Sequence, residues 1–200
     1  MYRIISGRWK SKRISAPKNF EVRPTTDFAK EALFSIIENR FNIDFTSASV
    51  LDLFAGIGSL SLEFASRGCE DVTAVEINAK HAAFIASTAS QLEMTLQVNV
   101  QRGDVFDYLK KNRSRKQFDL VMADPPFSTD EKKYDELISL VLNNPYLKPH
   151  GVFILEHQSR TKFDHPNLLD TRKYGNVSFS FFKPNEEGTS EVIEEKSEPE

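Results

Sequence analysis

The chain has 200 residues, of which 40% are hydrophobic and 28% are charged, and its net charge is −3 at pH 7. This length allows one domain with a full core, and no apolar run approaches the roughly 20 residues that span a bilayer, so we expect no membrane association. The one cysteine, Cys69, excludes an internal disulfide, which favours a reducing compartment, the cytoplasm.

Basic residues are concentrated near the start of the chain and acidic residues near its end. Residues 1–30 contain eight lysines and arginines against Glu21 and Asp27, and residues 185–200 contain seven glutamates against Lys196. The basic segment favours a polyanionic partner, although a solvated basic hairpin explains the same charge. The acidic segment has no hydrophobic pattern, which predicts that residues 185–200 are disordered.

Residues 1–22 predict a short β-hairpin. Tyr2–Ile5 and Lys12–Ile14 have the character of strands, with a turn-like Ser6-Gly7 between them. Basic residues alternate with apolar ones, so one face can pack while the other contacts phosphates. Trp9 can stack on a base, but we expect it to anchor the hairpin to the rest of the protein. The candidate nucleic-acid contacts are Arg3, Arg8, Lys10, Lys12, Arg13 and Arg23.

A helix and then a repeated strand–helix pattern follow the hairpin. Residues 25–27 can cap a helix whose apolar stripe extends to Phe41. Strands are predicted at residues 50–54, 71–76, 95–102, 118–123 and 152–157, with helices at 59–67, 79–92, 106–111 and 134–142. This alternation predicts a parallel, doubly wound sheet. Residues 171–174 and 176–182 predict a closing antiparallel pair, an ending typical of class I methyltransferases.

The segment from Val50 to Gly58 predicts a strand that runs into a glycine turn and then a helix. Gly56 and Gly58 let the backbone approach a ligand closely, because no Cβ intervenes, and the helix offers unpaired N–H groups at its first turn. The dinucleotide fingerprint is incomplete, since Ser61 stands where its third glycine is expected. The turn therefore indicates a nucleotide-like cofactor without naming it.

Two further acids end the next two strands. Glu76 is placed to accept ribose hydroxyls. Asp104 is placed to accept an adenine amine, although it fits equally well as the N-cap of a helix that begins at Val105. Asp52 suits the positive amino-acid end of S-adenosylmethionine and would repel a pyrophosphate. We therefore predict an S-adenosylmethionine site formed by Asp52, Phe54, Gly56, Gly58, Glu76, Asp104 and Val105.

A second motif, Asp124-Pro125-Pro126-Phe127, follows another predicted buried strand. The prolines fix φ and forbid a helix, so the main chain is extended and rigid. Asp124 and the Pro125 carbonyl can then accept the two hydrogens of an exocyclic amine and direct its lone pair at a methyl donor, while Phe127 stacks on the base. The alternative is a structural Pro-Pro turn beside a buried phenylalanine. We predict catalytic roles for Asp124, Pro125, Pro126 and Phe127.

Seven segments carry a resemblance to a known family: Arg3–Gly7, the basic run up to Pro17, Arg23–Asp27, Glu31–Phe34, Asp52–Gly58, Ser66–Gly68 and Asp124–Phe127. They resemble the RsmD family, the bacterial 16S rRNA (guanine(966)-N(2))-methyltransferases, over about residues 1–184. The resemblance implies S-adenosylmethionine as the methyl donor. It also implies that the acceptor is the N2 amine of guanine 966 in 16S rRNA, within a partly assembled small ribosomal subunit.

The fold class that follows is α/β, a Rossmann-like class I S-adenosylmethionine-dependent methyltransferase fold. We expect a mostly parallel seven-stranded sheet with an antiparallel C-terminal strand, plus a small N-terminal β-hairpin and helix extension. The expected regions are a basic, RNA-facing extension (1–45), a methyltransferase domain (46–184) and an acidic tail (185–200). We expect a monomer, and we predict no metal site because the histidines lack metal-ligand spacing.

Two other classes of function stay open. One is an amine methyltransferase for another RNA, for DNA adenine or for a protein glutamine, since these enzymes use similar acid-Pro-Pro-aromatic turns. The chain has no separate DNA target-recognition domain, which argues against DNA. The other is a non-catalytic RNA-binding factor for ribosome assembly, against which the intact Asp52, Glu76, Asp104 and Asp124 argue.

Overall fold

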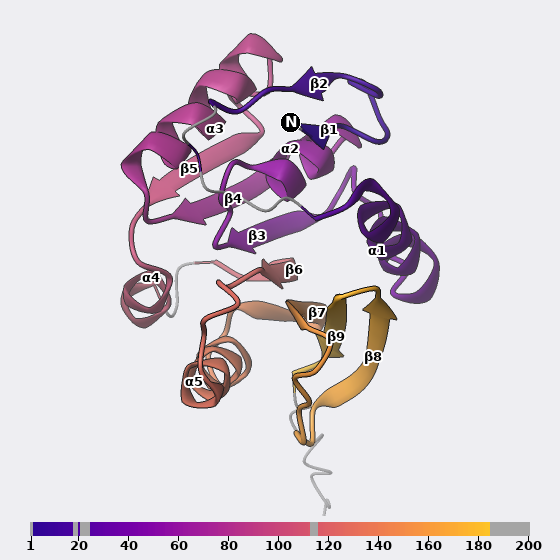
Figure 1. Cartoon of the computed structure of the whole chain (residues 1–200), viewed down its shortest axis with the longest axis vertical. Helices are drawn as coiled ribbons and strands as arrows, with labels where there is room; N and C mark the ends of the chain where they lie inside the picture. The colour runs from indigo at the N-terminus through magenta and orange to yellow at the C-terminus, as the bar shows by residue number, and fades with distance from the viewer. Residues whose placement is uncertain (1, 18–19, 21–24, 113–115, 185–200) are drawn as a thin grey trace, which may run out of the picture.

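The structure, a computed structural model, describes residues 2–17, 20, 25–112 and 116–184. Within these residues, seven strands form the central sheet in the order β5-β4-β3-β6-β7-β9-β8 (Figure 1). The strands are β3 (Ser49–Leu53), β4 (Asp71–Glu76), β5 (Val98–Arg102), β6 (Phe118–Ala123), β7 (Leu147–Gln158), β8 (Leu168–Tyr174) and β9 (Val177–Phe182). The helices are α1 (Asp27–Arg40), α2 (Ser59–Ser66), α3 (Ala79–Gln91), α4 (Val105–Lys111) and α5 (Glu131–Leu142).

The strand directions confirm the predicted fold class. Five adjacent strands are parallel to one another, namely β5, β4, β3, β6 and β7. The strand β9 is antiparallel to both β7 and β8. The predicted antiparallel pair at the end of the chain is therefore present as β8 and β9. Because β4, β3, β6 and β7 are adjacent and parallel, their carboxyl ends meet at one edge of the sheet, where such folds bind ligands.

Helices cover both faces of the central sheet, with α1, α2 and α3 on one face and α4 and α5 on the other (Figure 1). Side chains alternate between the two cores along each strand: Val50 and Leu120 pack toward α1–α3, and Leu51 and Val121 pack toward α4 and α5. Strands buried on both faces have continuous apolar sequences, which is why the sequence predicted them so clearly.

In the central sheet, β4 and β6 match their predicted bounds, whereas the other five strands differ from theirs, β7 most of all. β5 begins at Val98 because the preceding residues form a turn, in which the Gln97 N–H donates to the Met94 carbonyl at 3.0 Å. Leu96, which looked like a strand residue, is 98% exposed in this turn. β7 begins at Leu147, well before the predicted start, through an irregular stretch of pairing with β6.

The N-terminal hairpin is present but has short strands, β1 (Tyr2–Arg3) and β2 (Arg13–Ile14). It lies against the end of α2: the Arg8 N–H donates to the Ser66 carbonyl at 2.7 Å. Trp9 anchors the hairpin as predicted, since its backbone N–H donates to the Ser66 hydroxyl at 3.0 Å and its ring packs against the core.

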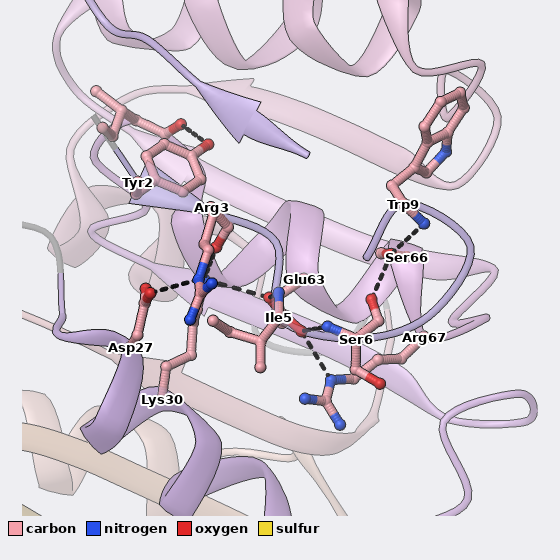
Figure 2. Close-up of polar contacts among 11 residues, drawn as sticks. Tyr2, Arg3, Ile5, Ser6, Trp9, Asp27, Lys30, Glu63, Ser66 and Arg67 are labelled. Atoms are coloured by element: carbon pink, nitrogen blue, oxygen red, sulfur yellow. Dashed lines mark hydrogen bonds and ion pairs between the residues drawn. The ribbon is translucent and has the colours of Figure 1, made fainter. Parts of the chain in front are cut away.

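A buried charge network fixes the hairpin to the helices (Figure 2). The carboxylate of Glu63 in α2 is fully buried, and it accepts the N–H of Ile5 at 2.7 Å and that of Ser6 at 2.9 Å. The same carboxylate lies 3.2 Å from Lys30 Nζ of α1 and 3.0 Å from Arg67 Nε. The hairpin therefore shares one core with α1 and α2.

Two predicted features lie outside the described residues. They are Arg23, a candidate RNA contact, and the acidic segment 185–200. The role of Arg23 and the disorder of the acidic segment stay predictions.

Candidate active site

A cavity of about 820 Å³ lies at the carboxyl edge of the central sheet, within the size range of cofactor pockets. Each of four adjacent strands brings one acid to its lining: Asp52 from β3, Glu76 from β4, Asp124 directly after β6 and Glu156 from β7. Three of these acids were predicted as site residues from the sequence, and Glu156 was not.

The strand register explains why the acids gather. Leu53 pairs with Val75 of β4 and with Ala123 of β6, and Ala123 pairs with Leu155 of β7. The residues that follow these pairs lie in one row across neighbouring strands, and they are Glu76, Asp124 and Glu156. The residues two positions earlier belong to the core under α1–α3, namely Ala74, Met122 and Ile154. The acids therefore lie on that face of the sheet.

The loop after β3 has the tight geometry that its sequence predicts. Phe54, Gly56 and Gly58 have φ values of 62°, 57° and 78°. This left-handed region favours glycine and strains a phenylalanine. A Cβ at Gly58 would lie 3.0 Å from the side chain of Ile85 in α3. Because α2 begins directly after Gly58, the N–H groups of its first turn lie beside this loop.

Glu76 holds the glycine loop in place. Its side chain is buried, and its two carboxylate oxygens accept the N–H of Gly56 at 2.8 Å and that of Asn78 at 2.7 Å. A carboxylate has about four acceptor positions, so these bonds leave Glu76 able to accept ribose hydroxyls as well. The ribose role stays a prediction, and the structure adds a role in shaping the loop.

Asp52 lies buried beside α2, and the hydroxyl of Ser61 donates to its carboxylate. Ser61 therefore has a structural role of its own, apart from occupying the position where the fingerprint has its third glycine. It is the partner of the acid, which sequence reasoning missed. Burial raises the pKa of Asp52 to about 7, although the bond from Ser61 opposes this shift.

Asp104 and Val105 are not among the residues that line the cavity. Asp104 is the N-cap of α4, where its side chain accepts the N–H of Asp107 at 3.0 Å. This is the alternative role that the sequence allowed for it. Val105 is buried in the core beneath α4 and α5. Gly58 also does not line the cavity and acts through the shape of the turn. The adenine contact of Asp104 stays a prediction.

The Asp124–Phe127 turn forms another part of the same cavity wall. The N–H of Asp124 donates to the Leu53 carbonyl at 3.3 Å, which ties the turn to β3. The Gln158 side chain donates to the Phe127 carbonyl at 3.2 Å, which ties the turn to β7. Pro125 is buried, while the side chains of Asp124 and Phe127 are half-buried. The predicted acceptor residues thus share one cavity with Asp52, Gly56 and Glu76.

Glu156 is the lining acid that sequence reasoning missed. It is 3% exposed, and its carboxylate accepts the Thr25 hydroxyl at 2.8 Å. The signal was its position near the end of the predicted strand 152–157, in the same way that Glu76 ends β4. No turn motif follows Glu156, so its position near the end of a predicted strand was the single indication in the sequence that it belongs to the site.

A family model described as conserved hypothetical protein 95 matches residues 2–183. The chain belongs to this family, the RsmD family. The ribosomal RNA small subunit methyltransferase D of Buchnera aphidicola subsp. Baizongia pistaciae is 33% identical over 156 residues, which are 78% of this chain and 76% of that relative. The protein of the same name from Haemophilus influenzae is 30% identical over 192 residues, with 90% and 93% covered.

Solved structures agree with this assignment to the RsmD family. The structure of yhhF, a proposed methyltransferase from Escherichia coli, superposes with a TM-score of 0.75 at 25% identity, covering 92% of this chain and 97% of that one. The methylase HI0767 from Haemophilus influenzae, also assigned provisionally, gives a TM-score of 0.71 at 29% identity, with 90% and 97% covered. The fold is thus that of a class I methyltransferase.

A second cavity of about 500 Å³ adjoins the first in this RsmD-family protein. The two share Phe127, Gly175 and Asn176 as lining residues. The second cavity also contains two exposed cations, Arg160 and Lys173. Sequence reasoning did not single out either residue.

The predicted RNA contacts of the hairpin fall into two groups. Arg3 lies 2.6 Å from the carboxylate of Asp27, and Arg8 pairs with Glu93. Three others are exposed and form no ion pair with the described part of the chain, and they are Lys10, Lys12 and Arg13. None of these five residues lines the cavity. Their contact with RNA stays a prediction.

Two kinds of site are absent from the described residues. Within these ranges, no three or more histidine, cysteine, aspartate or glutamate side chains are grouped to hold a metal ion. The described helices are also too short or too polar to cross a membrane.

Proposed function

We propose that this protein transfers a methyl group from S-adenosylmethionine to the exocyclic N2 amine of a guanine in 16S rRNA, within the small ribosomal subunit. By the resemblance to its family, the guanine is guanine 966. The single observation that carries the proposal is that one cavity contains both the glycine loop after β3 and the Asp124–Phe127 turn after β6. Family membership supports rRNA as the substrate.

The donor end of the cavity fits S-adenosylmethionine in its chemistry. Glycine backbone lines one wall, and Asp52 and Glu76 supply acceptors for a positive amino-acid group and for ribose hydroxyls. An anionic pyrophosphate would meet two acids at this place. When bound, S-adenosylmethionine supplies an electrophilic methyl group on a sulfonium.

At the acceptor end, Asp124 and the Pro125 carbonyl accept the two amine hydrogens. This arrangement directs the nitrogen lone pair toward the methyl carbon, and alignment of the reacting atoms supplies most of the rate. The ionised Asp124 also stabilises the positive charge that develops on the nitrogen as the new N–C bond forms. The methylated cation then loses a proton to water. Phe127 stacks on the base and fixes its plane.

The target base has to leave its stack to enter a pocket at a strand edge, so we expect an unpaired guanine in a loop or bulge. The alternative substrates, DNA adenine and protein glutamine, share the amine chemistry. The relatives named as rRNA methyltransferases favour rRNA over both.

A methylation assay tests the proposal. The full chain is incubated with methyl-labelled S-adenosylmethionine and small subunits that lack this modification, and the labelled nucleoside is identified and mapped. We expect one N2-methylguanosine in 16S rRNA. Label on another nucleoside, on DNA or on protein would replace the proposed substrate, and the absence of label would favour a non-catalytic assembly factor.

A further inference from the structure

Glu156 is a buried acid for which the methyl-transfer chemistry above has no use. Burying a carboxylate is costly unless it is hydrogen-bonded or meets a partner. The Thr25 hydroxyl donates to Glu156 at 2.8 Å, and both residues line the cavity. The Thr25 bond orients the carboxylate within the same cavity that contains the Asp124–Phe127 turn.

The register places Glu156 next to the acceptor motif. Ala123 of β6 pairs with Leu155 of β7, and Asp124 and Glu156 are the residues that directly follow this pair. Neighbouring strands lie about 4.8 Å apart. Two carboxylates with this backbone spacing can meet two adjacent hydrogen-bond donors on one edge of a planar base.

Guanine has such an edge, because its N1–H lies beside its N2 amine. Adenine instead presents an unprotonated N1, an acceptor, beside its amine. An ionised carboxylate can only accept hydrogen bonds. It therefore pairs with the N1–H of guanine and repels the N1 lone pair of a base that lacks this hydrogen.

We propose that Glu156 accepts the N1–H of the target guanine while Asp124 and the Pro125 carbonyl hold the neighbouring amine. Glu156 is thus a specificity residue, and Thr25 positions it. This inference rests on the proposed function, and it names the feature of the base that the site recognises.

The base 2-aminopurine separates recognition from reactivity, because it keeps the N2 amine and lacks the N1–H, together with the O6 carbonyl of guanine. Small subunits are reconstituted with guanine or 2-aminopurine at the methylated position, and kcat/KM is measured for each. We expect the wild-type protein to prefer guanine by about 100-fold, since a site built to accept a hydrogen bond rejects an analogue that cannot donate it.

Glu156→Gln changes the preference in a defined direction. The amide can donate to the unprotonated N1 of 2-aminopurine, so the preference for guanine should shrink to below about tenfold. Glu63→Gln is the matched control, because Glu63 is a buried glutamate that does not line the cavity. Its loss should lower kcat/KM for both substrates by the same factor.

Each outcome decides the inference. Equal losses on both substrates for Glu156→Gln would make Glu156 purely structural and overturn it. If Glu156→Gln does not fold, the wild-type ratio decides, and a ratio near one overturns the inference. Failure of the wild-type protein to methylate guanine-containing subunits would instead contradict the proposed function.

The second cavity carries an independent inference about the RNA backbone. Its two cations, Arg160 and Lys173, form no ion pair within the described residues, and no described carboxylate lines the cavity. Phe127 lies between this cavity and the acceptor end of the first. We infer that the second cavity binds the sugar–phosphate of a nucleotide adjacent to the flipped guanine. This inference also rests on the proposed function.

Salt dependence tests this phosphate subsite. Arg160→Gln and Lys173→Gln should each raise the KM for small subunits and reduce the slope of log affinity against log salt by about 0.7–0.9, as expected for one lost phosphate contact. The affinity for S-adenosylmethionine should not change. Lys183→Gln is the charge-matched control, because Lys183 is exposed beyond the far end of β9.

An unchanged slope and KM in both cavity variants would overturn the subsite, while the methylated guanine would still support the proposed function. A loss of slope in Lys183→Gln of the same size would also overturn it, because the effect would then reflect net charge.

Discussion

Asp52 gives the site a pH dependence of its own. Burial raises its pKa to about 7. Only the ionised acid attracts the positive end of S-adenosylmethionine, so the affinity for this donor should rise by about tenfold between pH 6 and pH 8, and binding near pH 7 should release a proton. Calorimetric titration in buffers of different ionisation enthalpy measures both effects. Asp52→Asn should abolish the pH dependence.

The raised pKa of Asp52 also determines in which direction the free energy of unfolding changes with pH. The folded pKa lies above the ordinary value of 3.8, so between about pH 4 and pH 7 the folded state holds a proton that the unfolded state has lost. The contribution of Asp52 to the free energy of unfolding is therefore present at low pH and lost as the pH rises through about 7. Urea unfolding of the wild type and Asp52→Asn at pH 5 and pH 8 checks this, and a contribution that grows with pH would contradict it.

The sequence indicated the position of an acid best where a turn motif lies close to it at a strand end. Asp52 and Asp124 carry such motifs, and both line the cavity, while their roles stay predictions. Glu156 has no such motif. It lies beside Asp124 because β6 and β7 are neighbours in the sheet, and the sequence does not show this strand order directly. From the sequence, Ser61 was interpreted only as the missing third glycine of the dinucleotide fingerprint. Its hydrogen bond to Asp52 joins a strand to the following helix, and a local sequence pattern does not show such a contact.

At the scale of elements, the hairpin depends on one very close approach. Gly7 has a φ of 80°, and a Cβ there would lie 1.8 Å from the Ser66 carbonyl oxygen. Gly7→Ala should therefore separate the hairpin from α2 and lower the free energy of unfolding by about 3 kcal/mol or more, because overpacking adds to the strain of the left-handed region. The measurement is the midpoint of urea unfolding.

Gly175→Ala is the matched control for this prediction. Gly175 has a φ of 65° with nothing within 4 Å of a Cβ. It should cost only the conformational strain, about 1–2 kcal/mol. Equal losses for the two variants would show that the contact with α2 contributes nothing.

Most helices and strands could be predicted from local sequence patterns. Strands buried on both faces have continuous apolar sequences, and capped helices begin at recognisable capping residues. β4 and β6 match their predicted bounds. The packing of the hairpin did not follow, since Glu63 meets Ile5 and Ser6 across more than fifty residues of chain. Local pattern carries no information on such a pairing.

At the scale of the whole molecule, we expect the basic hairpin to contribute to subunit binding through its positive charge. Lys10, Lys12 and Arg13 are exposed, whereas Arg3 and Arg8 already have acidic partners. Replacing the first three with glutamine should lower the salt slope of subunit binding by about 2–3, since each phosphate contact contributes about 0.7–0.9. Binding is measured between 50 and 200 mM salt, roughly the range over which this effect is large.

A control with the same loss of charge lies near α4. Lys110, Lys111 and Lys116 already have acidic partners, Glu136, Asp107 and Asp71. Their joint replacement by glutamine should leave the slope almost unchanged. If both triple variants lowered the slope equally, net charge rather than the hairpin would explain RNA binding.

We expect Asp124 to act on the acceptor amine and not on the donor. The deciding measurement is the single-turnover rate of Asp124→Ala together with its donor Kd, with Asp135→Ala, an exposed acid of α5, as control. Asp124→Ala should lose about 10²–10³-fold or more in rate and keep a donor Kd within about twofold of the wild type. A retained rate, or a donor Kd weakened in proportion to the rate, would contradict it.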